Sequence, residues 1–253
     1  MKNKEQWSMR ILLVIVLMGL ALLACLALDK PSKAEITIIG YAREHGISTS
    51  AYPQVVIDLL ERNPEMEEFV LNYPFREETQ TDLTGYDLSQ GVPLLMQWDK
   101  RWGYLEYSGS MVAVTGSGPL CLAMAGYYVT EDARFYPENV VRFAIDNAYY
   151  SGGGSRQALI SEGGPALGLD VMEISVVQDK LATYLQAGNP VIAAVGPGDF
   201  TSSSQFIVLT GCHSGMVTVH DPNSYVNSGR EWSFEELLPQ LTNLWVIKAA
   251  AEG

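Results

Sequence analysis

The pattern of apolar and polar positions divides the chain into three stretches of different character. The first contains an unbroken apolar run of 18 residues from Ile11 to Leu28, with three basic residues before it. This length is at the lower limit for a segment that spans a bilayer, and basic residues before such a run stay in the cytoplasm. Residues 1–28 therefore predict a membrane or export segment, with the rest of the chain on the extracytoplasmic side of the cell membrane.

Three interpretations of this segment stay open. As an uncleaved signal anchor, it holds the protein in the membrane as a single-pass chain. As a lipoprotein signal, the run Leu22-Leu-Ala-Cys25 resembles a lipobox, with Cys25 as the candidate lipidated residue. As a signal peptide, it is removed.

Residues 29–90 read as a stalk followed by a helical preamble. The stalk, residues 29–49, predicts a short strand at Glu35–Ile39. Apolar residues then recur at helical spacing over residues 55–60, and Asn63-Pro64-Glu65 has the cap, early proline and early acid of a second helix start. Residues 74–90 are polar and rich in turn residues, which places a domain boundary there.

From residue 91 to 253 the pattern predicts one α+β domain, because helices come first and an antiparallel sheet follows. Residues 151–155 read as a flexible glycine-rich loop between these parts. The capping patterns at Ser175 and Ser233 predict helix starts, the first of them for a helix that ends at Gly188. The main predicted helices are 118–130 and 137–149, and the predicted strands are 190–195, 206–212, 216–221 and 244–249.

Charge and cysteine content limit the function classes. After Lys30 the chain has 12 Lys and Arg against 27 Asp and Glu, a net charge of −15. Such a domain repels nucleic acid and anionic lipid headgroups, so we expect no nucleic-acid partner. Cys121 and Cys212 lie in apolar elements and are expected to be free thiols rather than a disulfide. The histidines and cysteines form no cluster, so no metal or other cofactor is expected.

Three positions carry the candidate chemistry. Ser117 precedes an apolar helix, where serine is among the best N-cap residues. Gln205 opens one predicted strand and Asp221 closes the next, and the two strands are joined by a short hairpin loop. If Cys212 pairs near Met216, the register brings Gln205 opposite residues 221–223, so the Gln205 and Asp221 side chains are expected to meet.

The motifs around these positions resemble those of the C39-like, papain-related cysteine peptidases of bacteria. The resemblance covers residues 50–248 and rests on several separate motifs. It implies a papain-like fold with a nucleophilic cysteine, a histidine base and an orienting acid. The motifs are Gln97-Trp-Asp-Lys-Arg-Trp-Gly-Tyr104, Gly118-Pro-Leu-Cys-Leu-Ala-Met124, Pro197-Gly-Asp-Phe-Thr201, Asp221-Pro-Asn-Ser224, Trp232 and Asn243-Leu-Trp245.

The departures from this family fall on the chemistry. Ser117 stands where the family has its cysteine and Gln205 where it has its histidine, while Asp221 matches the acid. A glutamine that often completes the oxyanion hole six residues before the nucleophile is Met111 here, which leaves Gln97 as an alternative candidate for that role. A hydroxyl beside a carboxamide has neither an ionising nucleophile nor a base.

The remaining histidines are poor replacements for the base. His220 is adjacent to Asp221 and points to the other strand face by alternation, His213 lies in the far hairpin loop, and His45 lies outside the domain. The sequence therefore favours a membrane-anchored pseudo-peptidase whose former cleft binds a peptide or protein. The alternatives are a residual hydrolase that uses Ser117, or a purely structural surface module.

Overall fold

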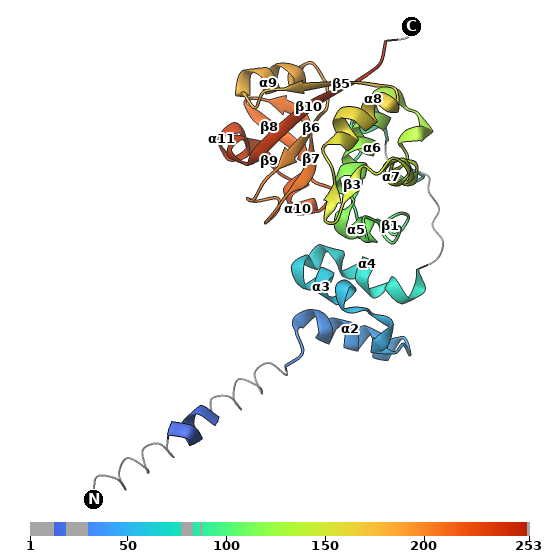
Figure 1. The fold of residues 1–253 in the computed structure, drawn as a ribbon, viewed down its shortest axis with the longest axis vertical. Helices are drawn as coiled ribbons and strands as arrows, with labels where there is room; N and C mark the ends of the chain where they lie inside the picture. The colour runs from blue at the N-terminus through green and yellow to red at the C-terminus, as the bar shows by residue number, and fades with distance from the viewer. Residues whose placement is uncertain (1–12, 19–29, 77–82, 87, 252–253) are drawn as a thin grey trace, which may run out of the picture. The chain divides into compact units, whose positions relative to one another are not determined.

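The structure is a computed structural model that describes residues 13–18, 30–76, 83–86 and 88–251 (Figure 1). The chain divides into two compact units, Met1–Pro74 and Phe75–Gly253. Of the expected membrane segment only residues 13–18 are described, as part of a helix, and Cys25 lies outside the described residues. Among the helices of the described residues, none has both the length and the apolar character needed to cross a bilayer.

The first unit is helical. Its helices are α2 (Lys33–Glu44), α3 (Gln54–Arg62) and α4 (Glu67–Leu71), with 3₁₀ turns at Thr49–Ala51, Pro64–Met66 and Tyr73–Phe75. The strand expected at Glu35–Ile39 is wrong, because these residues belong to α2. The Ser32 hydroxyl accepts a hydrogen bond from the Glu35 N–H, and the Glu35 carboxylate accepts one from the Ser32 N–H. This capping box fixes the helix start and outweighs the strand preference of the isoleucines that follow.

In the helical half of the second unit, the central helix is the buried α6 (Ser117–Thr130). Every residue from Gly118 to Gly126 is buried, as expected for a helix that is apolar on all sides. It is preceded by α5 (Val112–Thr115) and packs against α7 (Pro137–Asp146). Gly126 lets α6 lie close to the 3₁₀ turn Ala133–Phe135, since a Cβ atom there would lie 2.2 Å from the Phe135 ring.

The other half is a six-stranded antiparallel sheet with the strand order β5-β10-β6-β7-β8-β9. This helical and antiparallel-sheet architecture agrees with the predicted α+β class (Figure 1). β5 had not been predicted. The strands are β5 (Leu169–Ile174), β6 (Val191–Val195), β7 (Gln205–His213), β8 (Met216–His220), β9 (Glu231–Ser233) and β10 (Leu241–Ala249).

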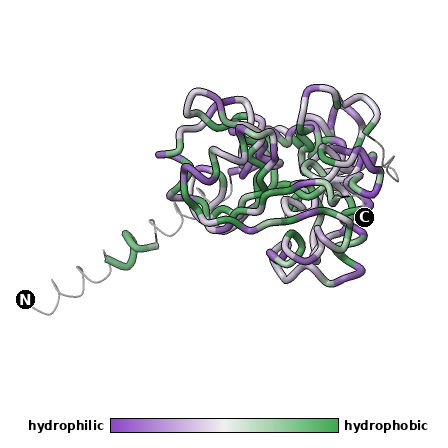
Figure 2. The backbone as a smooth tube through the Cα atoms, turned by 90° about the horizontal axis from the view of Figure 1, so that it is seen from above, coloured by the Kyte–Doolittle hydropathy of each residue, from purple (hydrophilic) through white to green (hydrophobic). Residues whose placement is uncertain are grey.

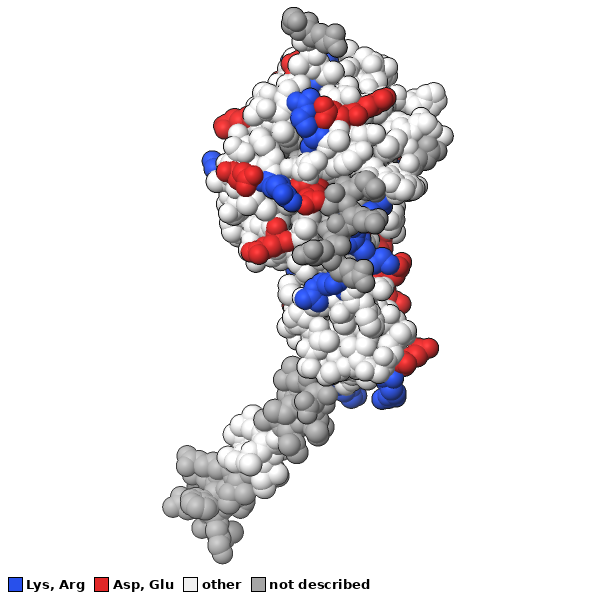
Figure 3. Space-filling model, turned by 90° about the vertical axis from the view of Figure 1, so that its right-hand side faces the viewer, with Lys and Arg blue, Asp and Glu red and all other residues white. Residues whose placement is uncertain are grey.

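Each face of this sheet has its own core. One core contains Phe206, Val208 and Trp245 with the buried side of α6. The other contains Ile207, Leu209 and Val246, packed with apolar residues of α9 (Gln178–Gln186) and α11 (Phe234–Leu237). Along the chain, apolar stretches alternate with polar loops (Figure 2), and acidic and basic side chains are interspersed on the face shown in Figure 3.

Three local predictions can be compared with this fold. Residues 150–155 form a small hairpin of β3 (Tyr150–Ser151) and β4 (Gly154–Ser155) rather than a flexible loop. The capping box expected at Ser175 is wrong, because this residue follows β5 directly and α9 starts later with Val177 as its cap. The capping box at Ser233 is confirmed.

The remaining short elements are β1 (Glu106–Tyr107), β2 (Ser110–Met111), α8 (Gly164–Ala166), α10 (Tyr225–Ser228), a π-helical turn Leu159–Gly163, and 3₁₀ turns at Leu88–Gln90, Ala133–Phe135 and Leu238–Gln240.

Candidate functional site

Ser117 is the first residue of α6, but it does not cap the helix. The N-cap position belongs to Gly116, because α5 leads almost directly into α6. The Ser117 hydroxyl instead accepts a hydrogen bond from the Phe206 N–H on β7, with an N···O distance of 3.3 Å. The capping role expected from the sequence is therefore wrong, and the hydroxyl joins the start of α6 to the start of β7.

Gln205 and Asp221 meet at the open end of the β7–β8 hairpin, as its register predicts. Gln205 Nε2 donates to Asp221 Oδ1 at 2.6 Å, and both residues are buried. Cys212 pairs with Val217, and an irregularity between Leu209 and Gly211 shifts the register by one residue toward the open end. The amide of Gln205 thus occupies the place where a base would be oriented by its acid.

The Asp221 carboxylate is held by further neutral donors that the sequence reading missed. Oδ1 also accepts from the Asn223 N–H at 2.8 Å, and Oδ2 accepts from Asn227 Nδ2 at 2.8 Å. The Asp221 N–H donates to the Ser228 hydroxyl at 2.9 Å. The Asp-Pro-Asn-Ser run could have indicated these donors, because it is typical of a turn followed by a helix cap. Ser224 caps the short helix α10, which contains Asn227.

Cys121 lies one turn after Ser117 on α6 and cannot take over as the nucleophile. Its thiol is fully buried and free, and Cys212 is free as well, as expected. Burial, with a smaller contribution from the Asp221 carboxylate, raises the pKa of Cys121 well above its usual value. The thiolate needed for nucleophilic attack is therefore disfavoured.

Gln97 connects three parts of the site through hydrogen bonds. Its backbone N–H donates to the Pro222 carbonyl at 2.8 Å, and its Nε2 donates to the Val112 carbonyl at 3.2 Å. The side chain is buried and ties the segment after Val92 to α5 and to the Asp221 turn. Met111, the position of the family's glutamine, is the cap of α5. The oxyanion role of Gln97 stays a prediction.

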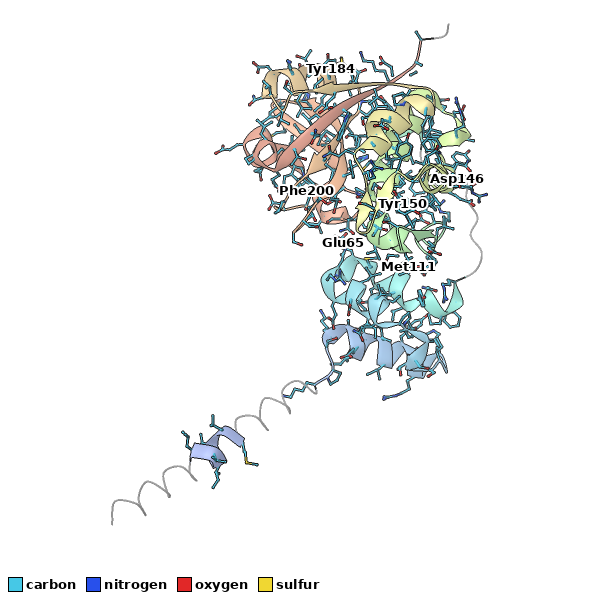
Figure 4. All side chains as sticks on the ribbon, in the orientation of Figure 1. Glu65, Met111, Asp146, Tyr150, Tyr184 and Phe200 are labelled. Atoms are coloured by element: carbon cyan, nitrogen blue, oxygen red, sulfur yellow. The ribbon has the colours of Figure 1, made fainter. Side chains whose placement is uncertain are left out.

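The loop before Gln205 is fixed by Gln240, a second residue that the sequence reading missed. Gln240 Oε1 accepts from the Asp199 N–H at 2.6 Å, and its Nε2 donates to the Asp199 carboxylate at 2.8 Å. Phe200, labelled in Figure 4, anchors the same loop by packing on Trp232 with 4.5 Å between ring centroids. The exposed residues up to Ser204 thus form a defined rim beside Gln205.

None of the three histidines, all of them within the described residues, lies within hydrogen-bond distance of the Ser117 hydroxyl. His220 pairs with Val208 across β7 and β8, which places it on the sheet face covered by α6. His213 is exposed in the hairpin, and His45 stacks on Tyr41 in the first unit with centroids 3.9 Å apart. The hydroxyl therefore has no imidazole partner to take its proton.

The His220 ring leads to a prediction on pH. Burial lowers its pKa below the usual 6.5, against the smaller effect of a hydrogen bond to the Pro93 carbonyl, and Nδ1 is buried without a partner. As the pH falls, His220 is therefore protonated at a higher pH in the unfolded chain than in the folded chain. The folded state loses stability relative to the unfolded state as the pH falls below about 6.5. We expect the urea midpoint to fall between pH 7 and 5.5, and His220→Gln to reduce that fall.

The matched control for this prediction is His213→Gln, because His213 is exposed at the far end of the same hairpin. It is expected to keep the pH dependence of the parent chain. An unchanged dependence in His220→Gln would show that the buried ring is not its source.

Gly118, the residue after Ser117, is in tight contact with β4. A Cβ atom at Gly118 would lie 2.3 Å from Ser155 Oγ, and that hydroxyl is also hydrogen-bonded to the Tyr107 hydroxyl at 2.8 Å. β4 therefore packs directly on the first turn of α6, next to Ser117. This packing of β4 on α6 requires glycine at position 118.

We expect Gly118→Ala to destabilise the protein by about 1–3 kcal/mol, since overpacking forces the β3–β4 hairpin away from α6. Urea unfolding measures the change. In a double-mutant cycle, Ser155→Gly should recover part of the loss by removing the clashing side chain. If the changes in unfolding free energy of the two variants were purely additive, residues 118 and 155 would not be in contact.

Residues 147–247 match the model of the Peptidase_C39 like family. This segment contains Gln205 and Asp221 but not Ser117, and over its length the match confirms the family resemblance read from the sequence. Among solved structures, the chain is similar to the peptidase domain of Streptococcus ComA, a bi-functional ABC transporter involved in a quorum sensing pathway. That match has 20% identity and a TM-score of 0.42, and it covers 53% of this chain and 91% of that domain. No curated protein matches the chain.

Proposed function

We propose that the protein is a C39-like pseudo-peptidase that binds a peptide or protein segment in the former active-site cleft without cleaving it. The observation that carries this proposal is the bonding of the three site residues. The Gln205 amide donates to Asp221, and the Ser117 hydroxyl accepts from a backbone N–H. A serine acts as a nucleophile only when a neighbouring group takes its proton, and a carboxamide does not.

The size of the chemical loss supports a role in binding rather than slow turnover. Removing one central member of a triad costs about as much as removing all of them, on the order of 10⁶-fold in turnover. Here two of the three positions have changed. The Asp221 carboxylate accepts hydrogen bonds from Gln205, Asn223 and Asn227, so it already serves as an acceptor for this turn.

We also propose that this domain is held on the extracytoplasmic side of the cell membrane by residues 1–28. The uncharged run of 18 residues behind a basic N-terminus supports this location. The high negative charge of the remaining chain fits a soluble domain that stays clear of anionic headgroups. The peptide ligand would then come from outside the cytoplasm.

A peptide-capture experiment with the full chain in detergent tests the binding proposal. The chain is exposed to a mixed library of unstructured peptides, and the retained peptides are identified by mass spectrometry. We expect retained peptides to be intact, and Ser204→Trp to abolish retention, because this exposed residue lies directly before Gln205 on the rim.

Ser161→Trp is the matched control, since Ser161 is also exposed but lies in a different part of the second unit. It should retain the same peptides as the parent chain. Retention that survives Ser204→Trp would favour a surface module in which the cleft plays no part. Truncated peptides would favour a residual hydrolase.

A further inference from the structure

A pocket lies at the end of α6 opposite to Ser117. Its volume is about 430 Å³, within the range of pockets that hold small ligands. At a rise of about 1.5 Å per residue, the 14 residues of α6 put this pocket roughly 20 Å from the Ser117 end. It is therefore separate from the former active site. The lining residues are Leu88, Ser89, Gly91, Tyr127, Tyr128 and Glu131.

Glu131 gives this pocket its charge. It is exposed, whereas the neighbouring Asp132 carboxylate is neutralised by Arg134 at 2.8 Å. Arg134 also donates to the Leu167 carbonyl, so its guanidinium is bound by Asp132 and Leu167. Among the described residues that line the pocket, Glu131 is the only one with a charged side chain.

The backbone at Glu131 is unusual for a residue of this type. Glu131 caps the C-terminus of α6 in the left-handed conformation, with φ of 53°, and its N–H donates to the Tyr127 carbonyl at 2.7 Å. Glycine or asparagine adopts this conformation more readily than glutamate. The cap fixes where the glutamate side chain leaves the helix, one turn after Tyr127 and beside the pocket.

Two tyrosines supply the remaining recognition chemistry. Tyr127 packs against Tyr136 with ring centroids 5.9 Å apart, and Tyr128 is 38% exposed. Burial, then Tyr136 and Glu131, raise the pKa of Tyr127, so its phenol stays neutral at physiological pH. Neutral aromatic rings attract organic cations through their electron-rich faces, and a nearby carboxylate adds Coulomb attraction.

We propose that this pocket binds an organic ammonium group, with Glu131 as its counter-ion and Tyr127 and Tyr128 as its aromatic contacts. Leu88 offers a contact for the apolar body of such a group, and Glu131 complements its charge. Both a small quaternary ammonium compound and the ammonium of a lysine side chain have this chemistry. The proposal is independent of peptide binding at the former active site.

Calorimetric titration of the full chain with choline chloride tests this proposal at constant ionic strength. We expect millimolar or tighter binding, with 3,3-dimethylbutan-1-ol, the uncharged isostere, roughly 10-fold weaker. Titration with Nα-acetyl-lysine methylamide in a second arm shows whether the pocket takes a lysine ammonium as well. Stronger binding there identifies a peptide side chain as the source, and stronger choline binding identifies a free quaternary ammonium.

Variants of the pocket locate the site. Glu131→Gln keeps the shape of the side chain and should weaken choline binding by roughly 10-fold, and Tyr128→Leu by a smaller factor. Glu162→Gln removes one exposed charge elsewhere and should change nothing, as should Ser204→Trp at the former active site. Circular dichroism of each variant checks the fold. No binding of either cation up to about 50 mM, equal binding of the uncharged isostere, or unchanged affinity in Glu131→Gln would overturn the proposal.

Discussion

Asp221→Ala is expected to lower the free energy of unfolding by about 3 kcal/mol, since the truncation strips the partners from three donors at once. Gln205 Nε2, the Asn223 N–H and Asn227 Nδ2 all donate to this carboxylate, and Gln205 is itself buried. A buried donor left without an acceptor costs about 1–3 kcal/mol, and relaxation of the turn recovers part of the sum. Urea unfolding at pH 7 measures the change.

Two comparison variants make this prediction specific. Asp221→Asn keeps one carbonyl oxygen for Gln205 and Asn223, so its cost should be smaller, about 1–2 kcal/mol. Asp146→Asn changes an exposed carboxylate at the end of α7 and should stay within about 0.5 kcal/mol of the parent chain. If Asp221→Ala were as mild as Asp146→Asn, the carboxylate would not be the centre of the site's hydrogen bonds.

Ser117→Cys combined with Gln205→His should restore a reactive thiol. The imidazole would take the position in which Gln205 now donates to Asp221, and Asp221 would then orient the ring. The thiol would stand at the first residue of α6, where the helix dipole favours the thiolate. We expect its pKa to fall from about 8.5 in a free cysteine to roughly 6 in the double variant.

The gain in alkylation rate depends strongly on pH, so the pH profile distinguishes an activated thiol from an ordinary one. At pH 5.5 the thiolate fraction rises by more than about 100-fold, but a weaker base is also a weaker nucleophile, so the expected net gain in alkylation rate is roughly 20-fold. At pH 7 these two effects almost cancel. Alkylation by iodoacetamide, followed at residue 117 by fragment-ion mass spectrometry, measures the full pH profile. Ser117→Cys alone is the control: it keeps the effect of the helix dipole but lacks the imidazole, so its profile should lie at higher pH than that of the double variant.

Equal profiles for the single and the double variant would show that more than the dyad has changed. The tight packing of Ser155 on Gly118 and the bonding of Gln97 to the Val112 carbonyl are the features that would then need to be altered. Cys121 does not disturb the assay, because burial raises the pKa of its thiol.

The strongest sequence patterns predicted their elements well. The apolar run after Ser117 and the two strands of the β7–β8 hairpin are strongly patterned. Because the loop between β7 and β8 is short, the strand register predicted the contact of Gln205 with Asp221. β5 was missed because Asp170 and Glu173 interrupt its apolar residues without the strict alternation that marks a half-buried strand. The strand predicted at Glu35–Ile39 follows the β-branched residues there, but the capping box at Ser32 starts a helix instead.

Long-range contacts explain what the sequence could not predict at the site. Serine before an apolar helix is usually a cap, but α5 enters α6 directly and leaves the Ser117 hydroxyl to the Phe206 N–H, 89 positions away in the chain. Gln240 reaches back 41 positions to hold the loop at Asp199. No local pattern encodes either contact. Asn227 was closer to prediction, since it lies only six residues after Asp221 in a turn-rich run.

The absence of a base beside the Ser117 hydroxyl can be tested by activity profiling of the full chain. The chain is incubated with a fluorophosphonate probe and, separately, with a peptide library, and both are analysed by mass spectrometry beside Ser117→Ala. We expect no probe on Ser117 and the same background of intact peptides for both chains. Probe on Ser117, together with peptide turnover that disappears in Ser117→Ala, would contradict it.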